Sequence, residues 1–369
     1  MIVRAKILVT STGIIPNVDI HISNGKIADI SKSTSQNAEY SAEILAPGFV
    51  DIHCHGGNGF HFFDLNAEAA QGSANFHLKH GTTSVVASFI AAQIPDLQKE
   101  ISYLVDQLPL LNVVGIHLEG PYLSEIFCGA HNPAFLSAPS ITEVKYLLDL
   151  GSGWIKMITI APELPNALET ISFLKSVGVI AAIGHSDADD QITTAAINAG
   201  ASMVTHFFSA MRPIHHRIGG MALTTLFDDR VNLELILDNV HIAKNAIAIP
   251  RHFSPERIVG ITDALAVAGQ PDGDYTLGTT QVELRNGVAK IKGKDLLAGS
   301  TLTMDRSFRT AVTKLGFTPD QAVRAFCTRP AQILGLKNVG DIRIGMDADF
   351  VLLNQEYELQ KVLFKGALV

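Results

Sequence analysis

Between residues 48 and 263 the sequence contains eight short apolar or β-branched runs, separated mostly by stretches long enough for a helix and two loops. The runs are 48–54, 82–88, 112–119, 154–162, 179–185, 202–208, 232–238 and 257–263. Strands that alternate with helices pair in parallel through right-handed crossovers, and eight such units suggest a closed barrel. An open doubly wound sheet is the alternative, but no Gly-x-Gly-x-x-Gly motif follows the first run. The pattern favours an α/β fold, a (β/α)8 TIM-like barrel.

The two ends of the chain have a different pattern. Residues 18–22 and 26–30 alternate apolar and polar side chains around Asn24-Gly25, a pair typical of tight hairpins. After a helical stretch near 318–334, the strand pattern returns at 348–353 and 362–365. A β-like segment, 275–291, precedes an expected helix at 301–315. We therefore predict a small β-sandwich formed from both chain ends, 1–47 and 338–369, beside a barrel domain at 48–337.

Composition limits the partners of the chain. The 369 residues carry a formal net charge of -8, which argues against nucleic acid or an acidic membrane surface. An anionic ligand would therefore need a local cationic pocket. Three widely spaced cysteines, Cys54, Cys128 and Cys327, argue against a disulfide framework and for a reducing compartment, so we expect a cytoplasmic protein. No apolar run approaches the ~20 residues that cross a bilayer.

Metal-ligating side chains end several of the predicted strands. His53 and His55 close the first run, and residues two apart on a strand face the same side, so both imidazoles can reach one ion. The later runs end in or near Glu119, His185, His206 and Asp263, and His241 lies just past the seventh run. Because the carboxyl ends of barrel strands meet at one mouth, we expect these side chains to converge. Core packing could explain any single histidine, but not the whole set.

Four imidazoles and two carboxylates suit one or two divalent ions, with zinc as the first choice and iron, manganese or cobalt as alternatives. Such an ion makes hydroxide available at neutral pH and polarises a carbonyl group. The expected chemistry is therefore hydrolysis of an amide or a related bond. Asp263 can take the proton of the attacking water and pass it to the leaving nitrogen.

Several phrases of the sequence resemble a known family. Residues 45–57, LAPGFVDIHCHGG, resemble the first metal strand of the amidohydrolase superfamily. HLEGP at 117–121, GAHNP at 129–133, GHS at 184–186, TDA at 262–264 and LAGSTLTM at 297–304 are similar to the N-acetylglucosamine-6-phosphate deacetylases within it. The resemblance is collinear over nearly the whole chain. It implies removal of the acetyl group from N-acetylglucosamine 6-phosphate, in a homodimer whose neighbouring subunits can help to complete the phosphate pocket.

The resemblance also implies roles for individual residues. The core metal ligands that it implies are Glu119, His185 and His206. His53 and His55 are present, as in members that bind two metals. His131 matches a loop histidine that approaches the acetyl carbonyl and stabilises the developing oxyanion. The residues implied for substrate and phosphate binding are Ser209, Ala210, Arg217 and His241.

Two departures from the family pattern leave the substrate open. Relatives usually carry asparagine at Ser209 and glycine at Asn239. The alternatives are therefore the galactosamine epimer or another small amide and, outside catalysis, a metal-binding barrel in which Asp263 is dispensable. We expect the backbone N–H groups of the turn at Ser209-Ala210 to remain available for a phosphate. The cationic residues of the following loop form either a phosphate patch or a solvated surface; they are Arg212, His215, His216 and Arg217.

Overall fold

An eight-stranded parallel sheet forms the centre of the protein in a computed structural model that describes residues 1–34, 37–110 and 112–369. Its strands follow one another in chain order around the sheet, and each coincides with a predicted run to within a few residues. They are β5 (Phe49–Cys54), β8 (Thr82–Phe89), β9 (Val113–Glu119), β10 (Ile155–Ile160), β11 (Ile180–Ile183), β12 (Met203–Val204), β13 (Asn232–Ile236) and β14 (Ile258–Ile261).

The first and last of these strands meet and close the sheet. The Asp263 N–H donates to the His53 carbonyl at 2.9 Å, and Cys54 and Ala264 form a parallel bridge. The Thr262 hydroxyl donates to the buried Asp51 carboxylate at 2.6 Å across the same seam. The sheet is therefore a barrel, and the alternative of an open doubly wound sheet is wrong.

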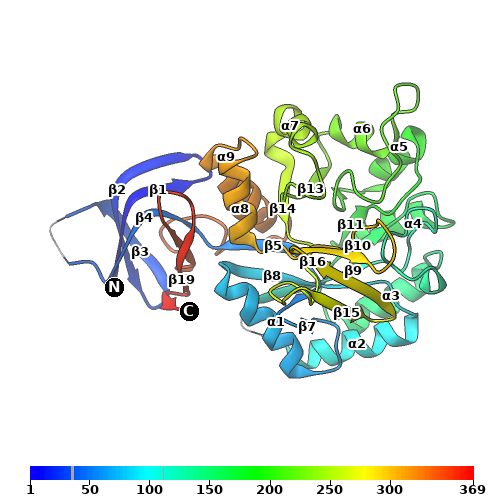
Figure 1. Ribbon diagram of the computed structural model, residues 1–369, viewed down its shortest axis with the longest axis horizontal. Coiled ribbons are helices and arrows are strands. Elements are labelled where there is room, and N and C mark those ends of the chain that lie inside the picture. Colours follow the sequence, from blue (N-terminus) through cyan, green and yellow to red (C-terminus); the bar gives the residue numbers. More distant parts are fainter. Residues whose placement is uncertain (35–36, 111) are drawn as a thin grey trace.

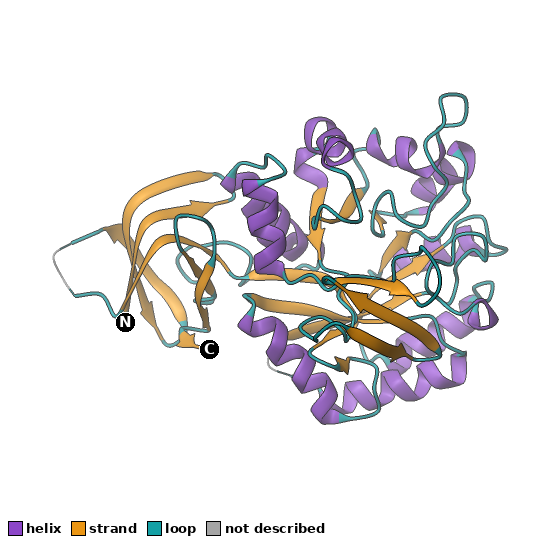
Figure 2. Ribbon diagram, in the orientation of Figure 1, coloured by secondary structure: helices purple, strands orange, loops and turns teal. Residues whose placement is uncertain are grey.

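A helix follows each barrel strand and packs outside the barrel (Figure 2). The helices are α1 (Ala67–Lys79), α2 (Ile94–Gln107), α3 (Ile141–Leu150), α4 (Ala167–Ser176), α5 (Asp190–Ala199), α6 (Gly220–Leu226), α7 (Lys244–Phe253) and α8 (Met304–Thr313). Successive strand residues face opposite sides, so Val85 and Ala87 join the large core beneath the helices, whereas Val86 packs with Met157 and Ile261 from other strands. Burial on both faces explains the continuous apolar runs.

Both chain ends build one seven-stranded sheet beside the barrel (Figure 1). Its order is β20-β19-β18-β4-β1-β2-β3. Hydrogen bonds from Ile27 N to Met346 O (2.9 Å) and from Ala348 N to Gly25 O (2.8 Å) join β3 to the segment before β18. The sheet therefore rolls over a shared core, so the predicted β-sandwich is built from one continuous sheet. Its strands are β1 (Ile2–Thr10), β2 (Gly13–Ser23), β3 (Lys26–Lys32), β4 (Tyr40–Pro47), β18 (Phe350–Leu353), β19 (Leu359–Phe364) and β20 (Ala367–Leu368).

Short elements complete the fold around the barrel. The predicted β-like segment is a three-stranded antiparallel sheet of β15 (Gly273–Leu277), β16 (Thr280–Arg285) and β17 (Val288–Ile291), which lies across the barrel in Figure 1. A small hairpin joins β6 (Gly56–Gly57) to β7 (Phe60–His61). The predicted helical stretch consists of α9 (Pro319–Val323), a π-helical turn at Arg324–Thr328 and α10 (Arg329–Ile333), and 3-10 turns lie at Pro133–Phe135 and Pro255–Arg257. No helix in the described part of the chain is both long and apolar enough to cross a membrane.

Candidate metal centre and active site

The polar side chains that end the barrel strands converge in one cavity of about 940 Å³. Its walls include the predicted metal-site residues His55, Glu119, His185, His206 and Asp263, and also His131. His53 lies beside them and is fully buried. The expectation that residues more than 200 positions apart meet at the barrel mouth is therefore confirmed by the structure.

Glu119 lies at the centre of this group. Its Oε1 atom is 3.1 Å from His206 Nε2, 3.2 Å from His185 Nε2 and 3.4 Å from His53 Nε2. Its Oε2 atom is 3.2 Å from the Nε2 atoms of both His55 and His131. The two carboxylate oxygens therefore face two different sets of histidines.

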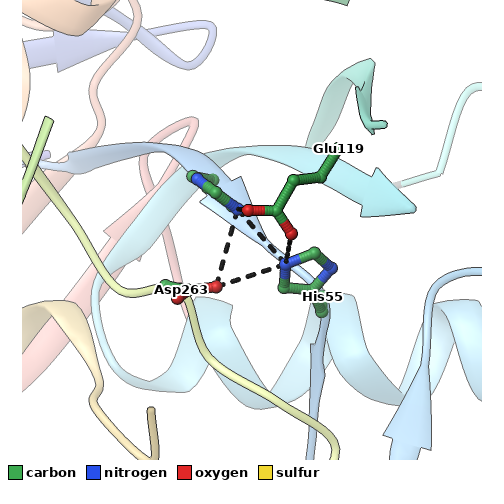
Figure 3. Close-up of side chains that lie close together, drawn as sticks. His55, Glu119 and Asp263 are labelled. Carbon is green, nitrogen blue, oxygen red and sulfur yellow. Dashed lines mark hydrogen bonds and ion pairs between the residues drawn. The ribbon is translucent and has the colours of Figure 1, made fainter. Parts of the chain in front are cut away.

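Asp263 lies beside one histidine of each set. Its Oδ1 atom lies 3.2 Å from His55 Nε2 and 3.5 Å from His53 Nε2, as the dashed lines in Figure 3 show. His53, His55, Glu119 and Asp263 thus form one compact group of possible ligands. Glu119 also lies against His185 and His206, whose Nε2 atoms are 2.8 Å apart. The arrangement offers two neighbouring positions for a cation that share Glu119.

The hydrogen bonds behind the imidazoles fit metal binding. His55 Nδ1 donates to the Ser88 carbonyl at 3.1 Å, and His185 Nδ1 donates to the Phe127 carbonyl at 2.8 Å. Because a carbonyl only accepts, the proton lies on Nδ1 and the Nε2 lone pair points into the site. The Nε2 atoms of His53 and His55 are only 3.2 Å apart, and a cation bound to both rings in their neutral form would stabilise this close approach. The residues therefore fit a borderline divalent metal.

Carboxylates control the protonation of the histidines in this site. Burial lowers the pKa of His55, but hydrogen bonds to Asp263 and Glu119 outweigh it and raise that pKa to about 9. Burial also opposes the charged form of His53, yet the neighbouring Glu119 and Asp263 charges raise its pKa well above the usual range. Burial opposes the charged form of Glu119 and raises its pKa. The charge of His53 and the contacts with the other histidines together outweigh burial, so this pKa lies well below the usual range. A metal must therefore displace protons from these histidines.

His131 comes from the loop after β9 and reaches the same centre. The Ala91 N–H donates to its Nδ1 atom at 3.2 Å, so the ring proton lies on Nε2. That N–H group points toward Glu119 Oε2, 3.2 Å away, and is a hydrogen-bond donor at the cavity wall. This position is compatible with the predicted contact to a substrate carbonyl.

Three of the predicted metal-site residues have left-handed backbone conformations. The φ angles of His185, His206 and Asp263 are 47°, 28° and 50°. Such angles are uncommon outside glycine and cluster at functional sites. They end the strands abruptly and present the three side chains at the mouth.

The proposed phosphate side is only partly assembled. Ser209, Ala210 and His241 line the cavity. The Ser209 N–H already donates to the His206 carbonyl at 2.8 Å, so the expectation that it remains available is wrong for this residue. His241 Nδ1 donates to Asp238 at 2.7 Å, and this carboxylate raises the pKa of His241 although burial opposes the shift. Asn239 has a φ of 62°, a conformation that asparagine tolerates, so the turn does not require glycine.

The basic loop does not enter the cavity of its own chain. Arg217 is exposed and lies outside the residues that line the cavity, and its Nη1 atom contacts His216 Nε2 at 3.2 Å. Arg212 forms a 2.8 Å ion pair with Asp187 instead. The predicted phosphate patch is therefore not formed around this cavity by the single chain.

Sequence reasoning missed one buried residue of the site. Glu234 lies in β13 with no exposed surface, and its Oε2 atom accepts hydrogen bonds from His53 Nδ1 (3.1 Å) and from the His206 N–H (3.2 Å). The available signal was a charged residue between Leu233 and Leu235 in an apolar run. Burying a carboxylate is costly unless it is paired, so its position alone indicates a role.

A (β/α)8 barrel that gathers histidines and carboxylates at the carboxyl ends of its strands belongs to the class of metal-dependent hydrolases. Residues 44–369 match the Amidohydrolase family, and the chain belongs to this family.

Several relatives match over their full length. An N-acetylgalactosamine-6-phosphate deacetylase of Escherichia coli O157:H7 is 33% identical over 100% of this chain and 98% of its own length. An N-acetylglucosamine-6-phosphate deacetylase of Lysinibacillus sphaericus is 32% identical over 99% and 97%. The crystal structure of N-acetyl-D-glucosamine-6-phosphate deacetylase from Mycobacterium smegmatis superimposes with a TM-score of 0.96 and 38% identity, covering 100% of both chains.

Proposed function

We propose that this chain removes the acetyl group from N-acetylglucosamine 6-phosphate and releases glucosamine 6-phosphate and acetate. The observation that carries the proposal is the group of histidines and carboxylates around Glu119 at the mouth of the barrel. Full-length similarity to enzymes named for this reaction supports it. The position of this group at the carboxyl ends of the strands is where barrels of this kind perform catalysis.

The proposed cofactor is one or two divalent metals per chain, with zinc favoured over iron, manganese and cobalt. Glu119, His185 and His206 would hold one ion, and His53, His55 and Asp263 would hold the other together with Glu119. When bound, the metal would activate a water molecule and polarise the amide carbonyl.

Two side chains beside the metal site, Asp263 and His131, would supply the proton transfers. Asp263 would act as general base toward the attacking water and then as general acid toward the leaving nitrogen, because its carboxylate lies beside His55 and His53 in the site. His131 would donate its Nε2–H to the carbonyl oxygen as negative charge develops there.

The phosphate would bind at Ser209, Ala210 and His241, with Arg217 supplied by a neighbouring subunit of a cytoplasmic homodimer. Arg217 is exposed between Ile214 and Ile218, which are 43% and 45% exposed, so its loop presents apolar surface to a partner. Because the Arg217 guanidinium lies outside the cavity of its own chain, it can complete the cavity of another chain.

The galactosamine epimer is a second candidate substrate. The Escherichia coli relative named for it is 33% identical over the whole of this chain. Ser209, where relatives of the glucosamine enzyme usually carry asparagine, lies in the cavity wall. The epimer preference therefore depends on the pocket rather than on the metal chemistry.

Acetate release from zinc-loaded protein tests the function directly. N-acetylglucosamine 6-phosphate, its galactosamine epimer and unphosphorylated N-acetylglucosamine are compared at equal concentration. We expect the first substrate to turn over fastest. Faster turnover of the epimer would select the second candidate, and no turnover of the three would leave another small amide or a non-catalytic barrel.

Mixed dimers test the role of Arg217. We expect Arg217→Ala to raise the KM for the phosphorylated sugar by at least tenfold, with little change for the unphosphorylated sugar. Because the arginine would act across the interface, mixing Arg217→Ala with Asp263→Asn chains should restore one complete site. Equal effects on both sugars would remove Arg217 from the phosphate pocket. A KM effect without restoration would place it in its own chain's site.

A further inference from the structure

A fully buried polar layer lies beneath the proposed metal ligands. Its carboxylate, Glu234, belongs to β13 and has no exposed surface. The Oε1 atom of Glu234 has no hydrogen-bond partner among the residues that the structure describes. A buried carboxyl group with one unpaired oxygen costs stability, so its presence needs a functional reason.

Glu234 contacts one proposed ligand from each of the two cation positions. Its Oε2 atom accepts from His53 Nδ1 at 3.1 Å and from the backbone N–H of His206 at 3.2 Å. The first contact keeps the His53 proton on Nδ1 and leaves Nε2 free to bind a cation. The second contact fixes the backbone of His206 where its φ is 28°.

His117, which packs against His53 in this layer, does not replace Glu234 as its acceptor. The ring of His117 lies 4.6 Å from that of His53, but edge to face. Both nitrogens of His117 are already engaged, Nδ1 with the Ser88 hydroxyl at 3.0 Å and Nε2 with the Thr159 hydroxyl at 2.8 Å. Without Glu234, His53 could carry its proton on Nε2, which would block a cation there.

Charge balance makes Glu234 more important for two ions than for one. Glu119 and Asp263 are the carboxylates within the cation positions, and together they neutralise one divalent ion. A second divalent ion leaves this buried region with excess positive charge, which a low-dielectric interior disfavours. The Glu234 carboxylate lies close enough to reduce that excess through its hydrogen bond to His53.

We propose that Glu234 is a positioning residue that determines whether the second cation, beside His53 and His55, binds. It orients His53 and contributes negative charge, and it does not touch the substrate. The inference rests on the proposed metal site and specifies how the two cation positions become unequal in affinity.

Zinc titration of chelator-treated protein tests the inference without measuring activity. Bound zinc per chain is measured after equilibrium dialysis, and affinities are obtained by competition with a chromophoric chelator. The wild type is compared with Glu234→Gln, which keeps the shape but removes the charge, and with a variant that replaces both His53 and His55 by alanine. Glu143→Gln is the matched control, because Glu143 bonds the Tyr122 hydroxyl away from the site.

We expect two zinc ions in the wild type and one when both histidines are replaced. Glu234→Gln should keep the first ion and bind the second about 10- to 100-fold more weakly. The Glu143→Gln variant should match the wild type. If Glu234→Gln unfolds, Glu234→Met replaces it, because an uncharged side chain of similar volume is tolerated at buried ionic positions, and the same loss is expected.

The outcomes separate this inference from the proposed metal site. Two ions in the wild type, lost with the histidine pair but bound equally well by Glu234→Gln and Glu234→Met, would overturn the role of Glu234 alone. One ion in every variant would overturn the two-ion site and the inference with it. Loss of both ions in Glu234→Gln at unchanged folding would also overturn it, because the residue would then support the whole site rather than the second position.

Discussion

Asp263 combines strain, charge and position in one residue. Its φ of 50° turns its carboxylate toward His55, and the charges of His53 and His55 keep its pKa below the usual range although burial opposes this. We expect Asp263→Asn to lower kcat roughly 10²- to 10⁴-fold, because the amide cannot accept the proton. Acetate release measures the loss, and the fully exposed Asp229→Asn is the control. Unchanged turnover in protein that retains metal would favour the non-catalytic alternative.

Glu100 is a titrating residue in the cavity wall that the proposed chemistry does not use. Burial, with the nearby Asp96 and Asp64 charges, raises its pKa to about 8. In the folded protein Glu100 therefore keeps its proton up to about pH 8, whereas in the unfolded chain it loses the proton near pH 4.5. The folded protein loses stability relative to the unfolded chain as pH rises from 4.5 through 8. We expect Glu100→Gln to stabilise the protein by roughly 2 kcal/mol at pH 8.5 and to have little effect at pH 4.5.

Urea unfolding at the two pH values measures this difference. Glu68→Gln is the control, because Glu68 is exposed in the first turn of α1. An equal shift of the Glu100→Gln midpoint at both pH values would contradict a titrating Glu100.

At the scale of elements, the junction between the end sheet and the barrel has no room for an additional side-chain atom. Gly48 separates β4 from β5, and a Cβ atom at this position would lie 2.2 Å from the Thr83 Oγ1 atom. We expect Gly48→Ala to destabilise the protein by about 1–3 kcal/mol or more, because β5 and β8 would have to separate. Thermal unfolding measures the change. Gly219→Ala is the control, since its nearest neighbour is 3.4 Å away, and a similar midpoint for both variants would contradict the argument.

The strands show what a sequence pattern can and cannot predict. The apolar runs predicted every barrel strand, yet β11 ends at Ile183 and β12 at Val204, before the runs at 179–185 and 202–208 end. His185 and His206 turn the backbone left-handed just after these points. Hydrophobicity reports burial on the two faces of a strand and does not report the sign of φ, so the runs predicted the elements but not where they end.

At the scale of the whole molecule, long-range pairing was the harder prediction. Both chain ends were predicted to meet, but rolling into one sheet depends on the bonds from Ile27 to Met346 and from Ala348 to Gly25, which no local pattern encodes. The same limit applies to Glu234 and Arg217. Glu234 contacts residues 181 and 28 positions away, and Arg217 lies outside the cavity of its own chain, so neither arrangement follows from spacing.

Metal removal should change the stability of the whole molecule in a pH-dependent way. In the metal-free protein His55 has a pKa of about 9, so its stabilising proton is fully bound below about pH 6.5 and lost as pH rises through 9. A bound metal replaces this proton and binds more tightly as pH rises, because the protons no longer compete. We therefore expect the difference between the urea midpoints of zinc-loaded and chelator-treated protein to widen between pH 6.5 and 9. In the variant with alanine at His53 and His55 the difference between the midpoints should widen less. A constant difference in the wild type would show that these histidines do not exchange protons for metal.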